Sequence, residues 1–120
     1  MKVKIISVHN QGDFDEEYVL LEVVNDCDIG NYVLADTTYT STGKVSNKLR
    51  HMYWFPDKEV KTGELISLRT KSGTSATVTN NSGTKVHRFY WGLKASVWND
   101  DGDCAVLLQT DDWQHFAATE

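Results

Sequence analysis

Short hydrophobic runs separated by polar turn residues extend along the whole chain. Gly, Asn, Asp and Thr recur between segments rich in Val, Ile, Leu, Tyr and Trp, and Pro56 is the one proline. This pattern is typical of β-strands joined by turns. The predicted strands are 2–8, 17–25, 31–36, 50–55, 64–70, 75–79, 85–92, 95–98 and 104–109. We therefore expect an all-β chain of about eight or nine mainly antiparallel strands, arranged as a sandwich or a barrel.

Hydrophobic and polar residues alternate within several of these strands, for example at 66–69, as expected when one face of a sheet is buried. The first strand changes phase between Ile5 and Ile6, which predicts a β-bulge. Residues 16–24 also fit a helical stripe. However, this segment is short and ends in β-branched residues followed by Asn-Asp, which favours a strand buried on both faces.

Two short turns and one long loop connect the predicted strands. Residues 80–83, Asn-Asn-Ser-Gly, predict a hairpin between 75–79 and 85–92 that uses positive φ. Asp101-Gly102 predicts a second hairpin, between 95–98 and 104–109. Residues 37–49 form a polar connection too long for a tight turn, and loops of this kind often carry binding residues.

Length and composition indicate one folded domain, residues 1–120. The chain is 40% hydrophobic and 24% charged, which excludes global disorder. Its net charge of −5 argues against a general duplex-DNA-binding protein. No segment approaches the roughly 18 apolar residues of a membrane span. The N-terminus lacks the apolar segment of a signal peptide, so we expect a cytoplasmic protein.

The sequence shows no arrangement of residues typical of catalysis. We expect Cys27 and Cys104 to be reduced thiols, with one disulfide as the alternative. None of the four histidines has a second ligand at zinc-site spacing. We therefore expect no cofactor, no metal and no enzymatic activity. An enzymatic alternative would have to use Asp100, Asp101, Asp103 and His115.

Residues 99–103 carry oxygen-bearing side chains at alternate positions, a spacing found in calcium-binding loops. No acidic residue closes the loop where an EF-hand has its bidentate Glu, and no flanking helices are predicted. An acidic hairpin turn is the favoured interpretation.

Basic residues precede aromatic residues in two places, 44–55 and 85–91. Such groups could follow a phosphate backbone and stack on bases, although alternation in a strand would turn half of the aromatics into the core. We expect the 37–51 loop and the outward face of 85–94 to bind a protein partner, with nucleic acid as the alternative. Exposed edge strands would also allow a homodimer to form by strand pairing. The predicted binding residues are Lys44, Lys48, Arg50, Lys85 and Arg88.

A Trp-Asn pair and a Gly-Asp pair lie close together within 97–107, and they comprise Trp98, Asn99, Gly102 and Asp103. Further motifs occupy 3–8, 17–25, 28–36, 55–56 and 62–65. Together these segments, over about residues 3–113, resemble a stand-alone prokaryotic member of the lamin tail domain family.

This resemblance implies an immunoglobulin-like β-sandwich that acts as a recognition module. In lamins the domain contacts chromatin, DNA and proteins, and in prokaryotes it often accompanies nuclease or surface-anchoring domains. In such a fold Trp98 would fill the core between the sheets. Asn99 and Asp103 would hold the following turn by bonding backbone N–H groups, and Gly102 would supply positive φ.

Overall fold

The computed structural model describes residues 1–99 and 102–119, and this part of the chain is all-β. A single turn of 3-10 helix, η1 (Ile29–Asn31), precedes β4. The strands are β1 (Val3–His9), β2 (Tyr18–Val23), β3 (Cys27–Asp28), β4 (Tyr32–Thr38), β5 (Met52–Trp54), β6 (Glu59–Val60), β7 (Leu65–Arg69), β8 (Ala76–Thr79), β9 (Lys85–Tyr90) and β10 (Asp103–Gln109).

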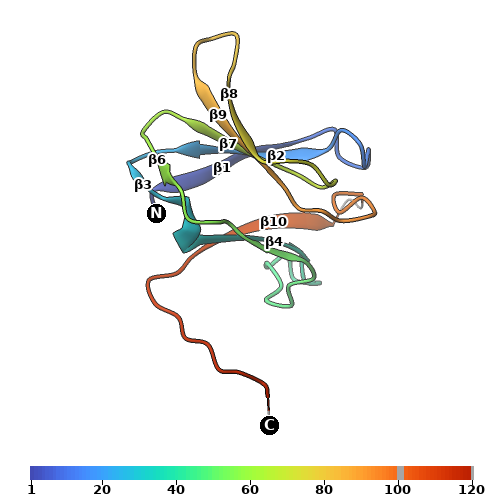
Figure 1. Ribbon diagram of the computed structural model, residues 1–120. Helices are drawn as coiled ribbons and strands as arrows, with labels where there is room; N and C mark the ends of the chain where they lie inside the picture. The colour runs from blue at the N-terminus through green and yellow to red at the C-terminus, as the bar shows by residue number, and fades with distance from the viewer. Residues whose placement is uncertain (100–101, 120) are drawn as a thin grey trace.

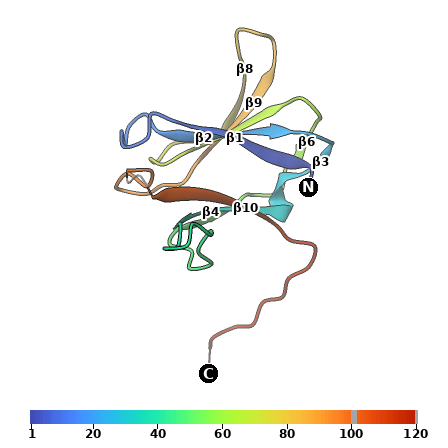
Figure 2. The same cartoon turned by 180° about the vertical axis from the view of Figure 1, so that it is seen from behind.

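The strands form two main layers, which Figure 1 shows from one side and Figure 2 from behind. One layer is a five-stranded sheet in the order β1-β2-β7-β9-β8, and the other is a three-stranded sheet in the order β10-β4-β5. β3 and β6 form a small separate sheet. Among the described strands, β7 and β9 pair in parallel and the other pairs are antiparallel. The prediction of a mainly antiparallel β-sandwich is thus confirmed.

The core lies between the two layers and receives side chains from both. In β2, Val19 and Leu21 are fully buried, and Leu34 of β4 is buried within the same cluster. Leu20 and Glu22 are only half-buried, so β2 is a strand as predicted but buries one face rather than two. Burial of one face per sheet is what the alternating pattern of a sandwich requires.

Two local predictions are confirmed. The register between β1 and β2 shifts between Ile5 and Ser7, which is the predicted bulge. The turn 80–83 joins β8 to β9 as an antiparallel hairpin, with Gly83 at φ 80°. The side-chain oxygen of Asn80 accepts hydrogen bonds from the backbone N–H groups of Ser82 and Thr84, which explains why the turn begins at an asparagine.

Other local predictions are wrong. Residues 95–98 form an irregular connection rather than a strand. Val97 and Trp98 are both buried, whereas successive side chains in a strand point to opposite faces. The predicted hairpin between 95–98 and 104–109 is absent, since β10 pairs with β4 instead. The positive φ predicted for Gly102 depends on its bond to Asp101, which lies outside the described residues. The two-residue strands β3 and β6 are too short to show any alternation in the sequence.

The C-terminal segment that follows β10 extends away from the sandwich (Figures 1 and 2). In the part of the chain that the structure describes, no helix has the length and apolar character needed to cross a membrane.

Candidate interaction surface

The two layers present chemically different outer faces. The outer face of the five-stranded sheet carries charged side chains from several strands, and Lys4 Nζ lies 3.3 Å from Glu22 Oε1. On the three-stranded sheet, the outward positions alternate with Leu34 and Leu107, which pack into or against the core. Hydrophobic residues occupy these outward positions as well. We call the following set the apolar face: Val33, Met52, Trp54, Val106 and Leu108.

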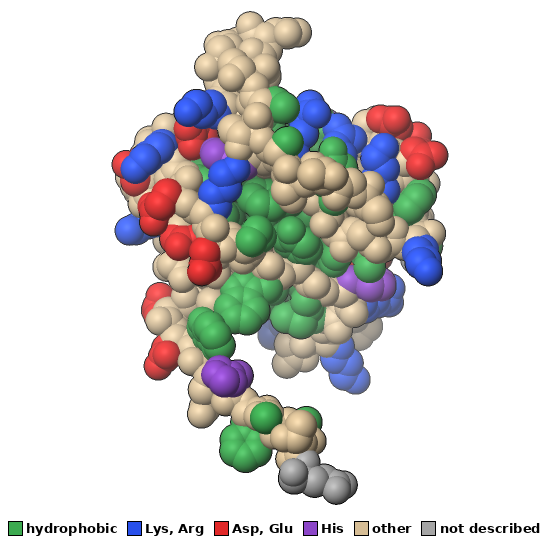
Figure 3. All heavy atoms as spheres, viewed as in Figure 1, with side chains coloured by type: hydrophobic (Ala, Val, Ile, Leu, Met, Phe, Trp, Pro, Cys, Tyr) green, Lys and Arg blue, Asp and Glu red, His purple; other side chains and the backbone are tan. Residues whose placement is uncertain are grey.

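Exposed hydrophobic side chains concentrate around this sheet. Within the described residues, seven of the ten large hydrophobic side chains that are exposed belong to the three-stranded sheet, its loop or the C-terminal segment. Met52 is 56% exposed and Trp54 is 50% exposed. Figure 3 shows hydrophobic side chains gathered across the middle of the molecule and down to the start of the C-terminal segment. A patch of this kind usually marks an interaction site.

Trp54 is held in place despite its exposure. Its indole Nε1 donates a hydrogen bond of 2.7 Å to the carbonyl of Gly30, and Trp113 packs edge-on against its ring with centroids 5.0 Å apart. Trp113 lies in the C-terminal segment, whose path beside β4 is set by a hydrogen bond from Thr110 N to Asn31 O. The exposed indole of Trp54 is therefore largely preorganised by contacts within the chain.

The loop 39–51 borders the apolar face. Tyr39 and Val45 form an isolated β-bridge across it, and the hydroxyl of Thr37 lies 3.0 Å from Ser46 O and 3.1 Å from Lys48 O. A hydrogen bond with Cys104 raises the pKa of Tyr39, which places these two side chains together at the same end of the sheet. The long polar connection predicted from the sequence is thus an ordered loop.

The end of this loop is fixed by a buried carboxylate. Asp36 is 2% exposed, and its Oδ1 accepts hydrogen bonds from the backbone N of His51 at 2.7 Å and from His51 Nδ1 at 3.0 Å. The His51 ring packs edge-on against Trp91, and Trp91 Nε1 donates to Met52 O at 3.3 Å. These contacts position the start of β5 and hence the exposed side chain of Met52.

The five predicted binding cations do not come together. Lys44, Lys48 and Arg50 are exposed on the loop beside the apolar face, whereas Lys85 and Arg88 are exposed on β9 in the other layer. The loop and the tip of the β8–β9 hairpin lie at opposite ends of the molecule in Figures 1 and 2. The structure therefore joins only the first three cations to the hydrophobic surface.

The residues of the Trp-Asn and Gly-Asp motifs lie around the connection to β10. Trp98 is 4% exposed and contacts Trp91, with ring centroids 6.3 Å apart. Asn99 is exposed, and Asp103 begins β10 opposite Thr38. The core position of Trp98 agrees with the prediction. The turn 99–103, for which an acidic hairpin was favoured over a calcium-binding loop, includes Asp100 and Asp101, which lie outside the described residues.

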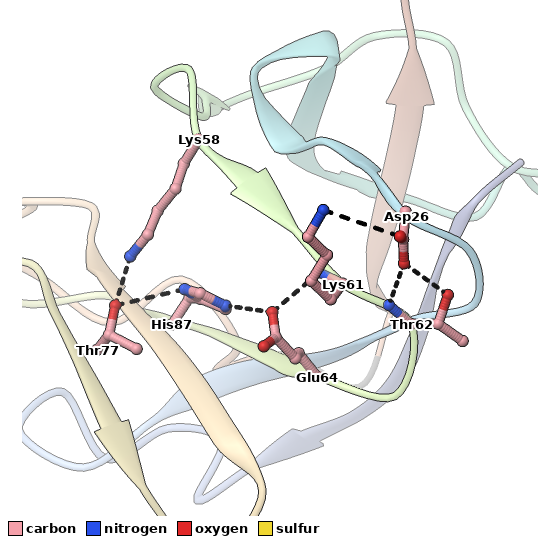
Figure 4. A network of polar contacts seen from close by, with 7 residues as sticks. All are labelled: Asp26, Lys58, Lys61, Thr62, Glu64, Thr77 and His87. Carbon is pink, nitrogen blue, oxygen red and sulfur yellow. Dashed lines mark hydrogen bonds and ion pairs between the residues drawn. The ribbon is translucent and has the colours of Figure 1, made fainter.

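A polar network, drawn in Figure 4, crosses the other end of the sandwich. His87 is 4% exposed, and its Nε2 donates to Glu64 Oε1 at 2.9 Å. Its Nδ1 lies 3.4 Å from Thr77 Oγ1, which also accepts a hydrogen bond from Lys58 Nζ. Because a carboxylate only accepts, the contact with Glu64 places a proton on Nε2 of His87.

The geometry of this network is that of contacts that hold strands together. Partial burial would raise the pKa of Glu64, but hydrogen bonds from His87 and from the backbone N of Lys61 outweigh it and lower the pKa. Asp26 accepts hydrogen bonds from the N–H and hydroxyl of Thr62 nearby. The contacts together join the β3–β6 sheet to β7, β8 and β9.

A second buried carboxylate, Glu17, connects three separate loops. It is 1% exposed and accepts hydrogen bonds from Gly12 N at 3.1 Å, Val97 N at 2.9 Å and the hydroxyls of Ser96 and Thr70. Glu17, Asp36 and Glu64 lie within the segments that resemble the lamin tail domain family, but no role for these acids was predicted from the sequence. Their burial and hydrogen bonds in the fold reveal their structural role.

The thiols and histidines are dispersed. Cys27 in β3 and Cys104 in β10 are free thiols, and burial raises the pKa of Cys27. Over residues 1–99 and 102–119, no three His, Cys, Asp or Glu side chains are placed to hold a metal ion together. His115 lies exposed in the C-terminal segment.

The sequence analysis missed the apolar face, although a signal for it was present. Residues 104–108, Cys-Ala-Val-Leu-Leu, are hydrophobic at consecutive positions, a pattern typical of strands buried on both faces. In the structure one face of β10 meets the core, and on the other face Val106 is half-buried and Leu108 is exposed. The consecutive hydrophobic residues therefore reflect a strand with hydrophobic side chains on both its inner and its outer face.

Comparison with known proteins identifies no relative: no protein-family model matches the chain, and no curated protein matches it. The resemblance to the lamin tail domain thus rests on the sequence motifs alone.

Proposed function

We propose that this chain is a non-enzymatic interaction module that binds a protein partner through the apolar face and the adjoining loop 39–51. The observation that supports this most strongly is the gathering of exposed hydrophobic side chains on one layer while the other outer face is charged. The cores of protein interfaces are enriched in aromatic residues and methionine, with a polar rim around them. Trp54 and Met52 supply such a core, and Lys48 and Arg50 supply such a rim.

The charges next to the apolar face suggest the chemistry of the partner. Lys44, Lys48 and Arg50 lie along one border, so a complementary protein would present a hydrophobic surface flanked by acidic groups. An immunoglobulin-like, lamin-tail type of sandwich is part of this proposal, as is a cytoplasmic location, which free Cys27 and Cys104 support.

Nucleic acid is the second candidate ligand. Exposed cations on the 39–51 loop lie close to the exposed indole of Trp54, and single-stranded nucleic acids bind to surfaces that combine cations with stacking aromatics. The net charge of −5 and the separation of Lys85 and Arg88 from this loop favour the protein partner.

The test is affinity capture from native lysate, with and without nuclease, using wild type and Met52→Glu. Ile6→Glu is the matched control, because Ile6 is 46% exposed but lies on β1 in the other layer. We expect a protein that survives nuclease, is lost with Met52→Glu and is retained with Ile6→Glu. Hydrogen exchange should then show protection of 52–54 and 104–108 in the purified complex.

Charge reversal separates the two candidate ligands. With a protein partner, Lys48→Glu and Arg50→Glu should weaken capture more than Lys85→Glu and Arg88→Glu. Gel-shift of single-stranded DNA and RNA at low salt that weakens steeply with added salt would instead support nucleic acid. A protein partner that binds wild type and Met52→Glu equally would contradict the assignment of this surface.

A further inference from the structure

The edge strands of the two sheets differ in how well they are protected against pairing with a strand of another chain. β1 has the bulge at Ile5 and the charged Lys4, while β5 and β8 have only three and four residues. β10 is seven residues long and pairs with β4 in unbroken register, from Asp103 opposite Thr38 to Gln109 opposite Tyr32. It contains no lysine, arginine, proline or bulge, which are the features that normally keep an edge strand from pairing.

The burial of β10 shows that its edge is open. Ala105 and Leu107 point toward the core, yet both are only half-buried. Their neighbour Leu34, one strand further into the same sheet, is fully buried. In the described strands, β10 has β4 as its only neighbour.

The direction of the unpaired backbone groups follows from one hydrogen bond. Thr110 N donates to Asn31 O at 2.8 Å, and the register of β10 and β4 places these two residues opposite each other. Backbone groups alternate in direction along an antiparallel strand. Val106 and Leu108 therefore point their N–H and C=O groups toward β4, and those of Ala105 and Leu107 point toward the open edge.

We propose that β10 pairs antiparallel with β10 of a second copy of this chain, about a two-fold axis at Val106. Ala105 then lies opposite Leu107 of the second copy, and the edge-facing N–H and C=O groups of these two residues match between the two strands. Asp103 lies opposite Gln109 rather than another acid, and the residues between are uncharged. The strand is thus complementary to itself in backbone pattern, hydrophobicity and charge.

This inference goes beyond the proposed function, because it uses the edge of the sheet, where only Val106 and Leu108 of the apolar face lie, and leaves Val33, Met52 and Trp54 uncovered. The dimer contains one continuous six-stranded sheet in place of two three-stranded ones. Its outer side joins two copies of the apolar face, so one dimer offers a partner two adjacent binding surfaces.

The test is sedimentation velocity of the full chain over about 1–100 μM, the range in which a modest interface associates. We expect wild type to dimerise and Val106→Lys and Val106→Glu each to weaken the dimer at least about tenfold, because like charges meet at the axis. An equimolar mixture of the two variants should form a heterodimer. Met52→Lys is the matched control, since Met52 lies on the opposite edge strand of the same sheet and should leave dimerisation unchanged.

A cysteine variant keeps the proposal testable if these charges impair folding. In a Cys27→Ser, Cys104→Ser background, Val106→Cys should form a disulfide-linked dimer on mild oxidation, because the two side chains face each other across a non-hydrogen-bonded pair. A chain that is monomeric throughout this range, or a dimer unaffected by Val106→Lys, would overturn the proposal. Loss of dimer with Met52→Lys would also overturn it and would assign the association to the apolar face.

Discussion

Glu17 illustrates how one buried carboxylate can order chain segments that form no strand. Burial alone would raise its pKa, but hydrogen bonds from Ser96, Thr70, Val97 and Gly12 outweigh that effect and lower the pKa below 4.5. The folded protein therefore favours the ionised form. The stability gained from this ionisation is present above the unfolded-state pKa and is lost as pH falls through the folded-state pKa.

We expect Glu17→Gln to lower the free energy of unfolding by about 1–3 kcal/mol at pH 7, because the amide leaves some of these donors without an acceptor. The difference in free energy of unfolding between wild type and Glu17→Gln should become smaller as pH falls below the folded-state pKa, because Glu17 of wild type is then also uncharged. Urea unfolding of both proteins at pH 7 and at pH 3 measures this difference at the two pH values. Glu16→Gln is the control, since Glu16 is exposed. A difference that grows on acidification would contradict the role of Glu17.

Trp98 is the largest side chain that residues 95–98 place in the core. Trp98→Ala should destabilise the fold by about 3–5 kcal/mol through loss of packing, and thermal or urea unfolding would measure this. Trp113→Ala should change stability by less than about 0.5 kcal/mol, because Trp113 is 60% exposed. Equal effects of the two substitutions would argue against a core role for Trp98.

At the level of elements, the sequence predicted strands well where alternation and turn chemistry agree. The β8–β9 hairpin has both, with Asn80 and Gly83 at the positions that the turn requires. The 95–98 prediction failed because a run of hydrophobic residues does not distinguish a strand from irregular chain packed into a core. The hydrogen bonds to Glu17 replace those of a sheet there, and they come from residues distant in sequence.

Gly83 tests whether the turn between β8 and β9 depends on positive φ. Gly83 lies at φ 80° with open space where a Cβ would be added, so Gly83→Ala should cost about 1–2 kcal/mol from backbone strain alone. Ser82→Ala is the control, because Ser82 is exposed in the same turn and should change the free energy of unfolding by less than about 0.5 kcal/mol. Urea unfolding of both variants tests this, and a larger loss with Ser82→Ala would contradict it.

For the whole molecule, the sequence predicted the layered all-β architecture but not the arrangement of its surface. Lys48 and Lys85 look equivalent in the sequence, since each precedes a group of aromatic residues. The order of strands places them on different layers, and no local pattern encodes that order. The apolar face could not be predicted for the same reason, because it depends on which strands lie together in one sheet and which of their faces points away from the core.

The pairing of β4 with β10 also has a consequence for folding during synthesis. Tyr32 pairs with Gln109 and Thr38 with Asp103, so this sheet joins segments from the first third and the end of the described chain. Contacts between such distant segments form slowly, and β10 is synthesised well after β4. Until then β4 has only one of its two partner strands, β5, and its other edge stays open to pairing with any extended hydrophobic segment nearby.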